Sequence, residues 1–317
     1  MTRHRNQRRS RPSLGRRLTL LVALLTAAAC TQGGERQPAQ EAPTPAQTSP
    51  APSAPPTATL IGGQQVSLQE VQDIGDAVRK YFDAFSADLK GLAAHSAGEL
   101  KVLAGWQRIL SGGSAGFGPL KPVAATILRL DVVSVKGSTA TVEINGQLDE
   151  TAFVIRGDRG EEKPLSTNIN GAVSLVRGAT WQVVDFHRGG RWAREQIFTK
   201  VRGQQTGQGV VVKVVGVDLR PKGTVLMMEV RNTTDLKAGA SGTVIRDASG
   251  KQLQIAQGRD TVVVEVGRRS KATTGLFYLN TLRPTTRRFN LLVHVNLGCN
   301  PVCKISTSLN IPVRLLR

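Results

Sequence analysis

The sequence has few cysteines, few aromatic residues and few acids. Three cysteines among 317 residues exclude the disulfide-dense mini-scaffolds and the multi-cysteine zinc modules, because both need more thiols than this chain supplies. Aromatic residues make up 4% of the chain, and 23 acids stand against 42 bases, which gives a net charge of +19. Hydrophobic residues reach 40%, which is typical of a soluble globular protein and not of a polytopic membrane protein.

Familiar catalytic motifs are also absent from the sequence. Four histidines occur, each isolated along the chain, so there is no helical His-Glu-x-x-His pair. No phosphate-binding glycine loop and no dinucleotide fingerprint is found either. We therefore expect neither an enzyme nor a bound cofactor or metal. The length favours about two domains, at roughly 100 to 200 residues each.

The first 29 residues have the pattern of a signal peptide. Residues 1–17 contain seven arginines and no acid, and residues 18–29 contain no charge. A basic segment followed by an apolar one is typical of export signals. The apolar stretch of 12 residues is shorter than the roughly 20 that a helix needs to cross a bilayer. The sequence thus predicts export without a transmembrane anchor.

The apolar segment ends in three alanines and a cysteine, Ala27 to Cys30. This ending resembles the lipobox of bacterial lipoproteins, in which the cysteine is acylated with chains such as palmitate and becomes the first residue after cleavage. The family usually has leucine where this chain has Ala27. The resemblance implies a cell-envelope protein held by its lipid on the extracytoplasmic face of a membrane. The alternative is ordinary cleavage after Ala29, which leaves Cys30 as a free thiol.

Residues 30–65 contain the cysteine and the linker that joins it to the folded part. Residues 31–59 carry seven prolines among Ala, Thr, Ser and Gln, with one base and two acids. Such a composition cannot form a core and predicts disorder. The 29 residues span about 90 Å as polyproline II and about 30 Å as a coil. The linker therefore holds the folded part away from the membrane, either to extend its reach or as a mere spacer.

Residues 66–200 begin with a helical pattern. Apolar residues recur every three or four positions from Leu68 to Leu92 and again from Leu100 to Leu110, which is the spacing of amphipathic helices. Each segment begins with a Ser-x-x-Glu capping box, at Ser67 and at Ser96. The sequence therefore predicts two capped helices.

The apolar period changes to two after these helices. Alternating segments occur at residues 128–132, 140–144, 165–175 and 181–186, with short turns at Gly137 and Gly178. Alternation of this kind predicts half-buried antiparallel strands. Helices followed by consecutive strands imply an α+β domain with the helices on one face of the sheet.

The last of these segments carries the pattern Gly-x-x-Trp-x-Val-Val-Asp, which ends at Asp185. Together with the order of helices and strands, it resembles the cone-shaped nuclear transport factor-like fold of many bacterial exported proteins. The resemblance implies an α+β cone-like domain with a pocket at its open end, and Tyr81, Asp131 and His187 are the candidate pocket residues. Asp185 and His187 are also a candidate acid and base. The alternative for this pair is a strand end that meets solvent.

Residues 204–317 predict a second, all-β domain. Seven or eight short strand patterns occur there without a helical pattern, which favours a β-sandwich. A strand that ends in a turn at Asn232 and a later Asp-x-x-Gly turn at Asp247 are similar to immunoglobulin-like domains of bacterial lipoproteins. The expected fold class is therefore an α+β cone-like domain followed by an immunoglobulin-like β-sandwich.

Cys299 and Cys303 are expected to form a disulfide, because exported proteins meet an oxidising compartment. A hairpin centred on Pro301 sets Leu297 opposite Ile305 and places the two cysteines opposite each other. Closing so short a loop contributes about 2 kcal/mol to stability. The alternatives are a redox-active pair and a metal-binding pair.

The positive charge is concentrated in the second domain. Residues 201–317 hold 18 bases and 6 acids, whereas residues 66–200 hold 16 bases and 15 acids. The candidate anion-binding residues form two clusters, Arg268, Arg269 and Lys271, and Arg283, Arg287 and Arg288. Such a surface attracts polyanions, which outside the cytoplasm are anionic lipids, phosphate-bearing wall polymers and acidic envelope proteins. Nucleic acid is not an expected partner, and the alternative is a solvated surface without a ligand.

Together these patterns predict a non-enzymatic, membrane-anchored lipoprotein of the cell envelope with a binding or scaffolding role. Its basic second domain is expected to contact anionic envelope material or a protein partner. The alternative hypothesis is a small-molecule binder or weak enzyme that uses the pocket of the cone. The patterns predict no oligomeric state.

Overall fold

A computed structural model describes residues 55–112, 118–156, 159–250, 252–253, 262–279, 281–299 and 302–317. The predictions for the signal peptide, for Cys30 and for residues 31–54 lie outside these residues. Within them, no helix is both long and apolar enough to cross a membrane.

The first helix, α1 (Leu68–Ala87), follows a two-stranded ribbon of β1 (Thr57–Thr59) and β2 (Gln65–Ser67). Its start is the predicted one, since the Ser67 hydroxyl accepts a hydrogen bond from the Glu70 amide at 3.2 Å. A cap of this kind stabilises a helix by about 1 kcal/mol. The middle of the predicted apolar stripe, Ile74, Val78, Phe82 and Phe85, is buried, whereas its first residue, Leu68, is exposed.

The second helix, α2 (Glu99–Leu110), begins differently from the prediction. Its N-cap is Gly98, with a φ of 58°, and no side chain caps it. Ser96 instead donates its hydroxyl hydrogen to the Leu92 carbonyl at 3.0 Å, so the second predicted capping box is wrong. The helix ends beside Gly112, whose φ of 82° favours glycine over any residue with a side chain. The described residues also include two short 3-10 turns, η1 (Leu92–Ala94) and η3 (Ala193–Glu195).

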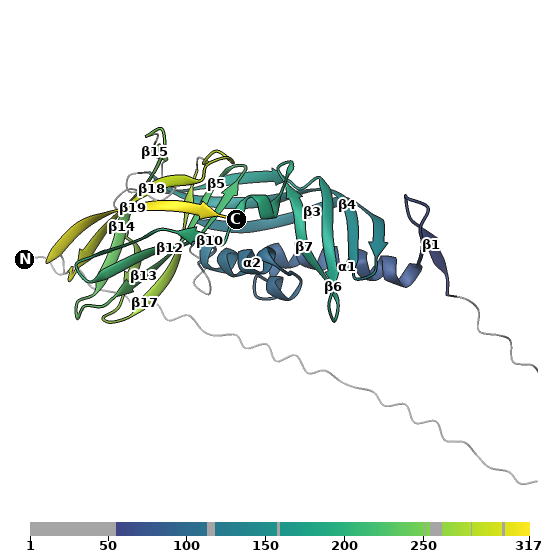
Figure 1. Ribbon diagram of the computed structural model, residues 1–317, viewed down its shortest axis with the longest axis horizontal. Coiled ribbons are helices and arrows are strands. Elements are labelled where there is room, and N and C mark those ends of the chain that lie inside the picture. The colour runs from purple at the N-terminus through teal and green to yellow at the C-terminus, as the bar shows by residue number, and fades with distance from the viewer. Residues whose placement is uncertain are drawn as a thin grey trace, which may run out of the picture. The chain divides into compact units, whose positions relative to one another are not determined.

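The first sheet has antiparallel strands in the order β3-β4-β6-β7-β8, with β5 also paired to β4. Its strands are β3 (Leu120–Lys136), β4 (Thr139–Arg156), β5 (Arg159–Asn168), β6 (Gly171–Arg177), β7 (Trp181–Arg188) and β8 (Arg191–Trp192). The turns at Gly137 and Gly178 lie where the sequence predicts them. Helix α1 packs against β3 and β7 and runs alongside this sheet (Figure 1).

Two details of this sheet differ from the prediction. The segment expected as one strand over residues 165–175 is divided between β5 and β6, which pair with different parts of β4. Leu128 is expected on the core face, but its side chain is 76% exposed. The register of β3 against β4 shifts between Ile127 and Arg129, and a bulge of this kind turns the extra residue away from the pattern of its neighbours.

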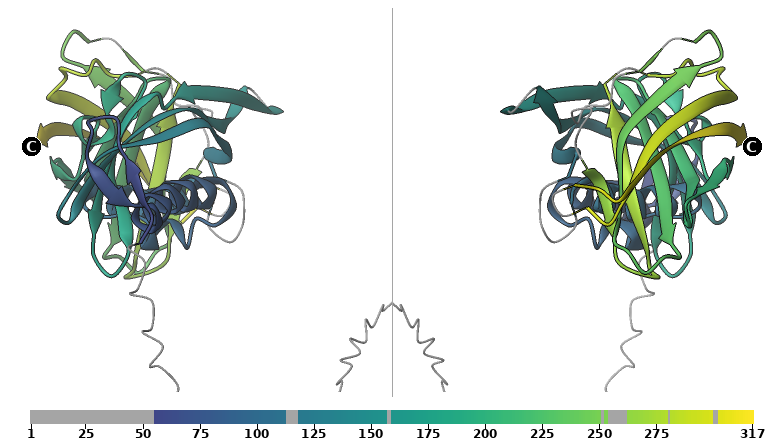
Figure 2. Two further views of the ribbon diagram at one scale, coloured as in Figure 1. Left: turned by 90° about the vertical axis from the view of Figure 1, so that its right-hand side faces the viewer. Right: turned by 90° about the vertical axis from the view of Figure 1, so that its left-hand side faces the viewer.

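Two further sheets form the C-terminal half of the chain. One has the order β11-β12-β13-β17, with β9 paired to β12, and the other has the order β10-β19-β18-β14-β15, with β16 paired to β14. The strands of the former are β9 (Ile197–Phe198), β11 (Gln204–Gly207), β12 (Val210–Arg220), β13 (Gly223–Asn232) and β17 (Lys271–Tyr278). The strands of the latter are β10 (Lys200–Arg202), β14 (Ala238–Asp247), β15 (Gln252–Leu253), β16 (Val262–Val266), β18 (Arg288–Leu297) and β19 (Ile305–Leu316). The right-hand view of Figure 2 faces these strands.

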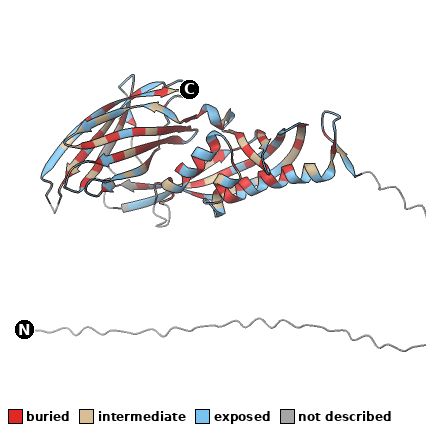
Figure 3. Cartoon of the chain, turned by 60° about the horizontal axis from the view of Figure 1, so that its bottom comes forward, coloured by how far each residue is buried: buried red, intermediate tan, exposed pale blue. Residues whose placement is uncertain are grey.

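Two apolar cores lie within residues 54–317, which form one compact unit. One core lies between the helices and the first sheet, and the other is shared by the two C-terminal sheets. Val225, Met227 and Phe277 come from the C-terminal half but belong to the first core. Buried and exposed residues alternate along the strands of both halves (Figure 3). The halves are therefore packed together, and the boundary between residues 200 and 204 stays a prediction.

The predicted fold class is wrong. The described residues do not form an α+β cone with N-terminal helices followed by an immunoglobulin-like sandwich. Most of them lie in strands of several sheets, and they include two α-helices. Strands β3 and β4 reach 17 and 18 residues, far beyond the short alternating segments that the sequence shows. In β3, bulges interrupt the alternation within a continuous strand. In β4, Gly146 and Glu150 occupy buried positions where apolar residues would have continued the pattern.

The C-terminal hairpin has the predicted register. Leu297 of β18 lies opposite Ile305 of β19. Cys299 and Cys303, between these strands, are joined by a disulfide with an S–S distance of 2.06 Å. The prediction of a disulfide is confirmed.

Candidate anion-binding surface

Three arginines stand in register on neighbouring strands of the C-terminal half. Arg202 of β10 lies opposite Arg314 of β19, and Arg314 also lies opposite Arg288 of β18. Directly opposite residues of antiparallel strands project from the same face of the sheet. All three residues are exposed. We call this set the arginine row.

Among the described residues, no acid forms an ion pair with the arginine row. Strands β10, β18 and β19 contain no aspartate and no glutamate. Within the part of the chain that the structure describes, no carboxylate lies within ion-pair distance of the three guanidiniums. Opposite charges at facing positions stabilise a sheet by about 0.2 to 1 kcal/mol, and like charges destabilise it. A bound anion therefore relieves repulsion along the row.

The alternation of the strands holds the row in place against this repulsion. Phe289 and Val313, the chain neighbours of two row members, are buried in the second core. Because side chains alternate along a strand, their burial turns Arg288 and Arg314 to solvent. Burying an apolar side chain of this size contributes about 1.5 to 3 kcal/mol, which exceeds the repulsion.

A pocket of about 410 Å³ lies at the Arg288 end of the row. Arg288 and Arg314 line it together with Asn290 and Asp247. The Asp247 carboxylate accepts hydrogen bonds from the amide and the hydroxyl of Ser249, at 2.9 and 2.6 Å, so it already closes its own turn. Two guanidiniums and an amide face the pocket beside this carboxylate, so its cations outnumber its acid. We call this the row pocket.

A larger pocket of about 500 Å³ lies beside the Arg202 end of the row. Its polar lining consists of Glu99, Arg194, Glu195, Thr199, Lys200 and Arg317. Lys200 lies two residues before Arg202 on β10, so the two side chains share a face of the sheet. We call this the junction pocket, because its walls come from α2 and η3 as well as from β10 and the C-terminal residue.

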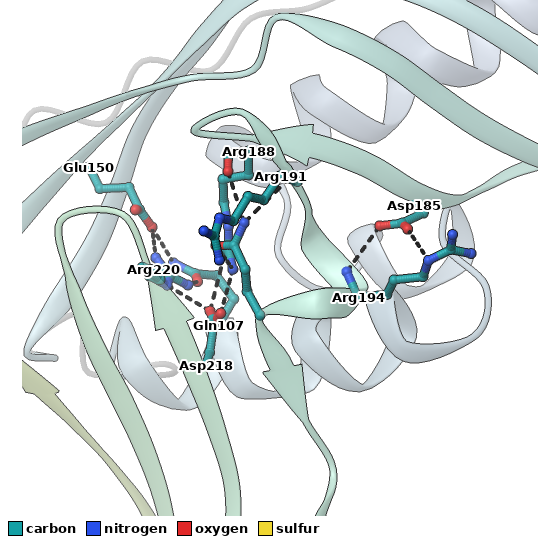
Figure 4. A network of polar contacts seen from close by, with 9 residues as sticks. Gln107, Glu150, Asp185, Arg188, Arg191, Arg194, Asp218 and Arg220 are labelled. Atoms are coloured by element: carbon teal, nitrogen blue, oxygen red, sulfur yellow. Dashed lines mark hydrogen bonds and ion pairs between the residues drawn. The ribbon is translucent and has the colours of Figure 1, made fainter. Parts of the chain in front are cut away.

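Two carboxyl groups at the junction pocket hold their protons more tightly than usual. Burial raises the pKa of Glu99, and the charge of Asp185 raises it further. Burial also raises the pKa of Asp185, although hydrogen bonds from the amides of Arg194 and Phe186 oppose the rise. These amides lie 3.1 and 3.0 Å from Asp185 Oδ1, and Arg194 Nε lies 3.1 Å from Oδ2 (Figure 4). The pocket therefore combines cations with carboxyls of reduced acidity.

The basic clusters predicted from the sequence do not form one surface. The cluster Arg268, Arg269 and Lys271 lies at the start of β17, and the cluster Arg283, Arg287 and Arg288 follows its end. The eight residues of β17 separate the clusters by about 25 Å. Asp235 pairs with Arg269 at 2.8 Å and Glu229 pairs with Lys271 at 3.3 Å, so the first cluster is largely neutralised. Only Arg288 of the six residues belongs to the arginine row.

Sequence reasoning missed the other members of the row, Arg202 and Arg314. A signal for one of them was present, because the hairpin register centred on Pro301 already sets Arg314 opposite Arg288, as the structure has it. The pairing of β10 with β19 had no such signal, since the two strands are far apart in the chain.

Two of the residues predicted to line a cone pocket lie in different surroundings. Tyr81 is buried against Phe82 and Phe186, with ring centroids 5.0 and 5.9 Å away, and burial raises the pKa of its hydroxyl. Asp131 forms an ion pair with Arg129 at 2.5 Å on a more exposed part of β3. Neither the row pocket nor the junction pocket includes Tyr81 or Asp131.

The third predicted pocket residue, His187, packs edge-on against Trp192, with the ring centroids 4.2 Å apart. Its predicted partner Asp185 bonds to Arg194 instead. The structure therefore gives the two side chains separate partners. It does not bring His187 together with Tyr81, and His187 lines neither of the two pockets described above.

A buried network of charged and amide side chains joins the two halves (Figure 4). Arg220 of β12 bonds to Asp218 and to Gln107 of α2, both at 2.8 Å, and pairs with Glu150 of β4. Asp218 also accepts a hydrogen bond at 3.1 Å from Arg188 of β7. Two guanidiniums and two carboxylates balance one another. The charges of the network are thus balanced within the chain, and Arg188 Nε is a buried donor without a hydrogen-bond partner among the described residues.

The electrostatics of Asp218 reflect this pairing. Burial alone would raise the pKa of Asp218, but the guanidiniums of Arg188 and Arg220 outweigh burial and hold the pKa below its ordinary value. Gln196 also belongs to the network, since it donates to the Arg188 carbonyl at 2.9 Å and accepts from the Arg188 guanidinium at 3.2 Å. We interpret the network as structural.

In the described part of the chain, no group of three or more histidine, cysteine or acidic side chains is placed to hold a metal ion. The sequence matches no protein-family model. It is also not significantly similar to any curated protein. The candidate surface is therefore defined by its own geometry.

Proposed function

We propose that the chain is an exported, lipid-anchored lipoprotein of the cell envelope that binds anionic material through the arginine row and has no catalytic role. The observation that supports binding is the row itself, which sets three exposed guanidiniums in register on strands without an acid. In this proposal Cys30 attaches the chain to a membrane, and the proline-rich linker gives the folded part its reach.

Phosphate groups suit this arrangement better than other anions. A guanidinium offers five N–H donors in a planar fork and stays charged at physiological pH. Its paired hydrogen bonds match the oxygens of a phosphate, and such charge-assisted bonds are about twice as strong as neutral ones. Outside the cytoplasm, phosphates occur on anionic lipids and on wall polymers.

A binding assay with the mature chain tests the proposal. The protein, with Cys30→Ser to avoid lipid, is mixed with vesicles of phosphatidylglycerol, with neutral phosphatidylcholine vesicles and with linear polyphosphate. We expect binding to the two anionic probes only. Binding should weaken strongly between about 50 and 200 mM salt, because each phosphate contact releases counter-ions.

Charge-reversal variants distinguish binding by the arginine row from nonspecific attraction by the net charge of the protein. The row variant carries R202E, R288E and R314E, and the control variant carries R268E, R269E and K271E. Both variants change the net charge equally, but only the row variant should lose binding. Equal loss in both variants would show that net charge alone attracts the anions, and it would refute the proposed site.

A further inference from the structure

The arginine row connects the two pockets on one face of the C-terminal half. Lys200 and Leu316 line the junction pocket and lie opposite each other on β10 and β19. Each is two residues from a member of the row, Arg202 or Arg314, and so projects from the same face. At the other end, Arg288 and Arg314 line the row pocket. One line of cations therefore runs from pocket to pocket.

Acids are confined to the ends of this line. Glu99 and Glu195 line the junction pocket together with Arg194, Lys200 and Arg317. Arg194 pairs with Asp185, so Lys200 and Arg317 face two carboxyl groups there, and burial raises the pKa of one of these, Glu99. In the row pocket, the one acidic lining residue is bonded to its own turn. Between the pockets, β10, β18 and β19 contribute no acid. An anion bound along the line therefore meets repulsion nowhere between the two pockets.

The line is longer than one phosphate group can contact. Neighbouring strands lie about 4.8 Å apart, so the row spans about 10 Å between its outer strands, and residues two apart on one strand add about 7 Å. A single phosphate engages one guanidinium through two parallel hydrogen bonds. Several phosphates in succession are needed to engage the whole line.

The pockets favour a chain over a membrane surface as the ligand. A bilayer presents its head groups as a broad surface, which meets exposed cations but does not enter hollows. Here cations line hollows of about 500 and 410 Å³ at the two ends of the row. A single flexible chain can lie along the row and enter both hollows.

We infer that the arginine row and both pockets form one continuous tract that binds a linear polyanion with repeated phosphate groups, of the class of phosphate-bearing wall polymers. This inference rests on the proposed function, and it adds the class of the ligand and its minimum length. The junction pocket receives one part of the polymer and the row pocket another, and the row bridges them.

Linear polyphosphates of defined length are the probe for this tract. The mature protein with Cys30→Ser is titrated with polyphosphates of about 3, 10 and 40 phosphates. Affinity is expressed per phosphate group, because a longer polyphosphate offers more equivalent binding positions and would otherwise bind more tightly for that reason alone. We expect affinity per phosphate to rise about tenfold from the shortest chain to the middle one and then to level off, because a chain that spans both pockets makes its later contacts within one complex.

Variants at the junction pocket distinguish binding along the whole tract from binding by the arginine row alone. K200A with R317A removes two cations of that pocket and leaves the row intact. We expect this variant to lose most of the gain with length and to keep the wild-type affinity for the shortest chain. K213A with R231A, which removes two exposed bases of β12 and β13, is the matched control and should bind every length like the wild type.

The possible results distinguish the tract from the proposed function. If affinity per phosphate does not change with length but the row variant still loses binding, the tract is overturned and the proposed function stands. If phosphatidylglycerol vesicles bind and no polyphosphate does, the ligand is a membrane surface and the tract is again overturned. If neither probe binds, the proposed function and the tract both fail.

Discussion

Arg288 and Arg314 lie directly opposite each other on β18 and β19, although both carry a positive charge and both are exposed. Like charges at facing positions repel, and Arg202 adds a third charge on the far side of Arg314. The burial of Phe289 and Val313 keeps these strands in register despite the repulsion. Repulsion in the row should lower stability slightly, so unfolding experiments can test the arrangement as well as the binding experiments proposed above.

Arg314→Glu places an acid between Arg202 and Arg288. We expect the free energy of unfolding to rise by about 0.5 to 1 kcal/mol at low salt, since two repulsive pairs become attractive. The gain should vanish near 1 M salt, where the Debye length is about 3 Å. Urea unfolding at both salt concentrations measures the effect, with Lys222→Glu in the exposed turn between β12 and β13 as the control. A loss of stability in the Arg314 variant at low salt would contradict electrostatic repulsion in the row.

Asp218→Asn removes one of the two carboxylates that balance Arg188 and Arg220. Breaking a buried ion pair in this way should lower the free energy of unfolding by about 3 to 5 kcal/mol at neutral pH. The pKa of Asp218 is held below its ordinary value of 3.8, so its ionised form stabilises the fold above that pH, and the stabilisation is lost as the pH falls through the lowered pKa.

The penalty of Asp218→Asn should therefore shrink in acid, and urea unfolding at pH 7 and at about pH 3 measures this change. Asp83→Asn, at an exposed position of α1, is the control and should cost little at either pH. If Asp218→Asn were as stable as the wild type at pH 7, the network would not be a paired charge cluster.

Gly216→Ala tests the contact between α2 and β12. A Cβ at Gly216 would lie 2.0 Å from the ring of Trp106, so the ring has to move, and overpacking of this kind costs about 1 to 3 kcal/mol. Gly105→Ala on the same helix meets nothing within 4 Å and should stabilise by about 0.5 to 1 kcal/mol. In a Trp106→Leu background, Gly216→Ala should be nearly neutral. An equal cost in both backgrounds would exclude the ring as the cause.

Cys299→Ser with Cys303→Ser removes the hairpin disulfide. We expect the free energy of unfolding to fall by about 2 kcal/mol, which is the chain-entropy value for so short a loop. Dithiothreitol should lower the stability of the wild type by the same amount and leave the double variant unchanged. Sensitivity of the double variant to dithiothreitol would point to another redox-active group.

Cys30→Ser tests the proposed lipid anchor. In bacteria that produce the full chain, we expect the wild type in the membrane fraction and labelled by palmitate, whereas the variant should be unlabelled and soluble. Thr31→Ser, next to the cysteine, is the control and should behave like the wild type. An unlabelled, soluble wild type would favour ordinary cleavage after Ala29.

The features that the sequence predicted correctly depend on residues close together in the chain. The Ser67 cap involves a residue three positions away, and the register that sets Leu297 opposite Ile305 follows from one short connection. The same register sets Arg314 opposite Arg288, but Arg314 was not among the predicted anion-binding residues. Local geometry of this kind leaves a direct trace in the order of residues.

The features that were missed depend on contacts between distant residues or on single-residue irregularities. Gln107 and Arg220 meet only because α2 packs on β12, and nothing in the spacing of either residue indicates the other. The bulge beside Leu128 reverses the face that alternation predicts, since a shift of one residue inverts the side-chain pattern of a strand. The length of β3 was missed for the same reason, because a bulged strand looks like several short ones in the sequence.

The order of the strands also determines when the anion surface exists. Strand β10 pairs in its sheet with β19 alone, and β19 is the last strand of the described chain, whereas β10 comes soon after the first sheet. In a chain that crosses a membrane with its N-terminus first, β10 therefore emerges before β19, the strand with which it pairs. If the chain is exported as proposed, the arginine row is completed only after translocation, and it then never meets the nucleic acids of the compartment in which the chain was made.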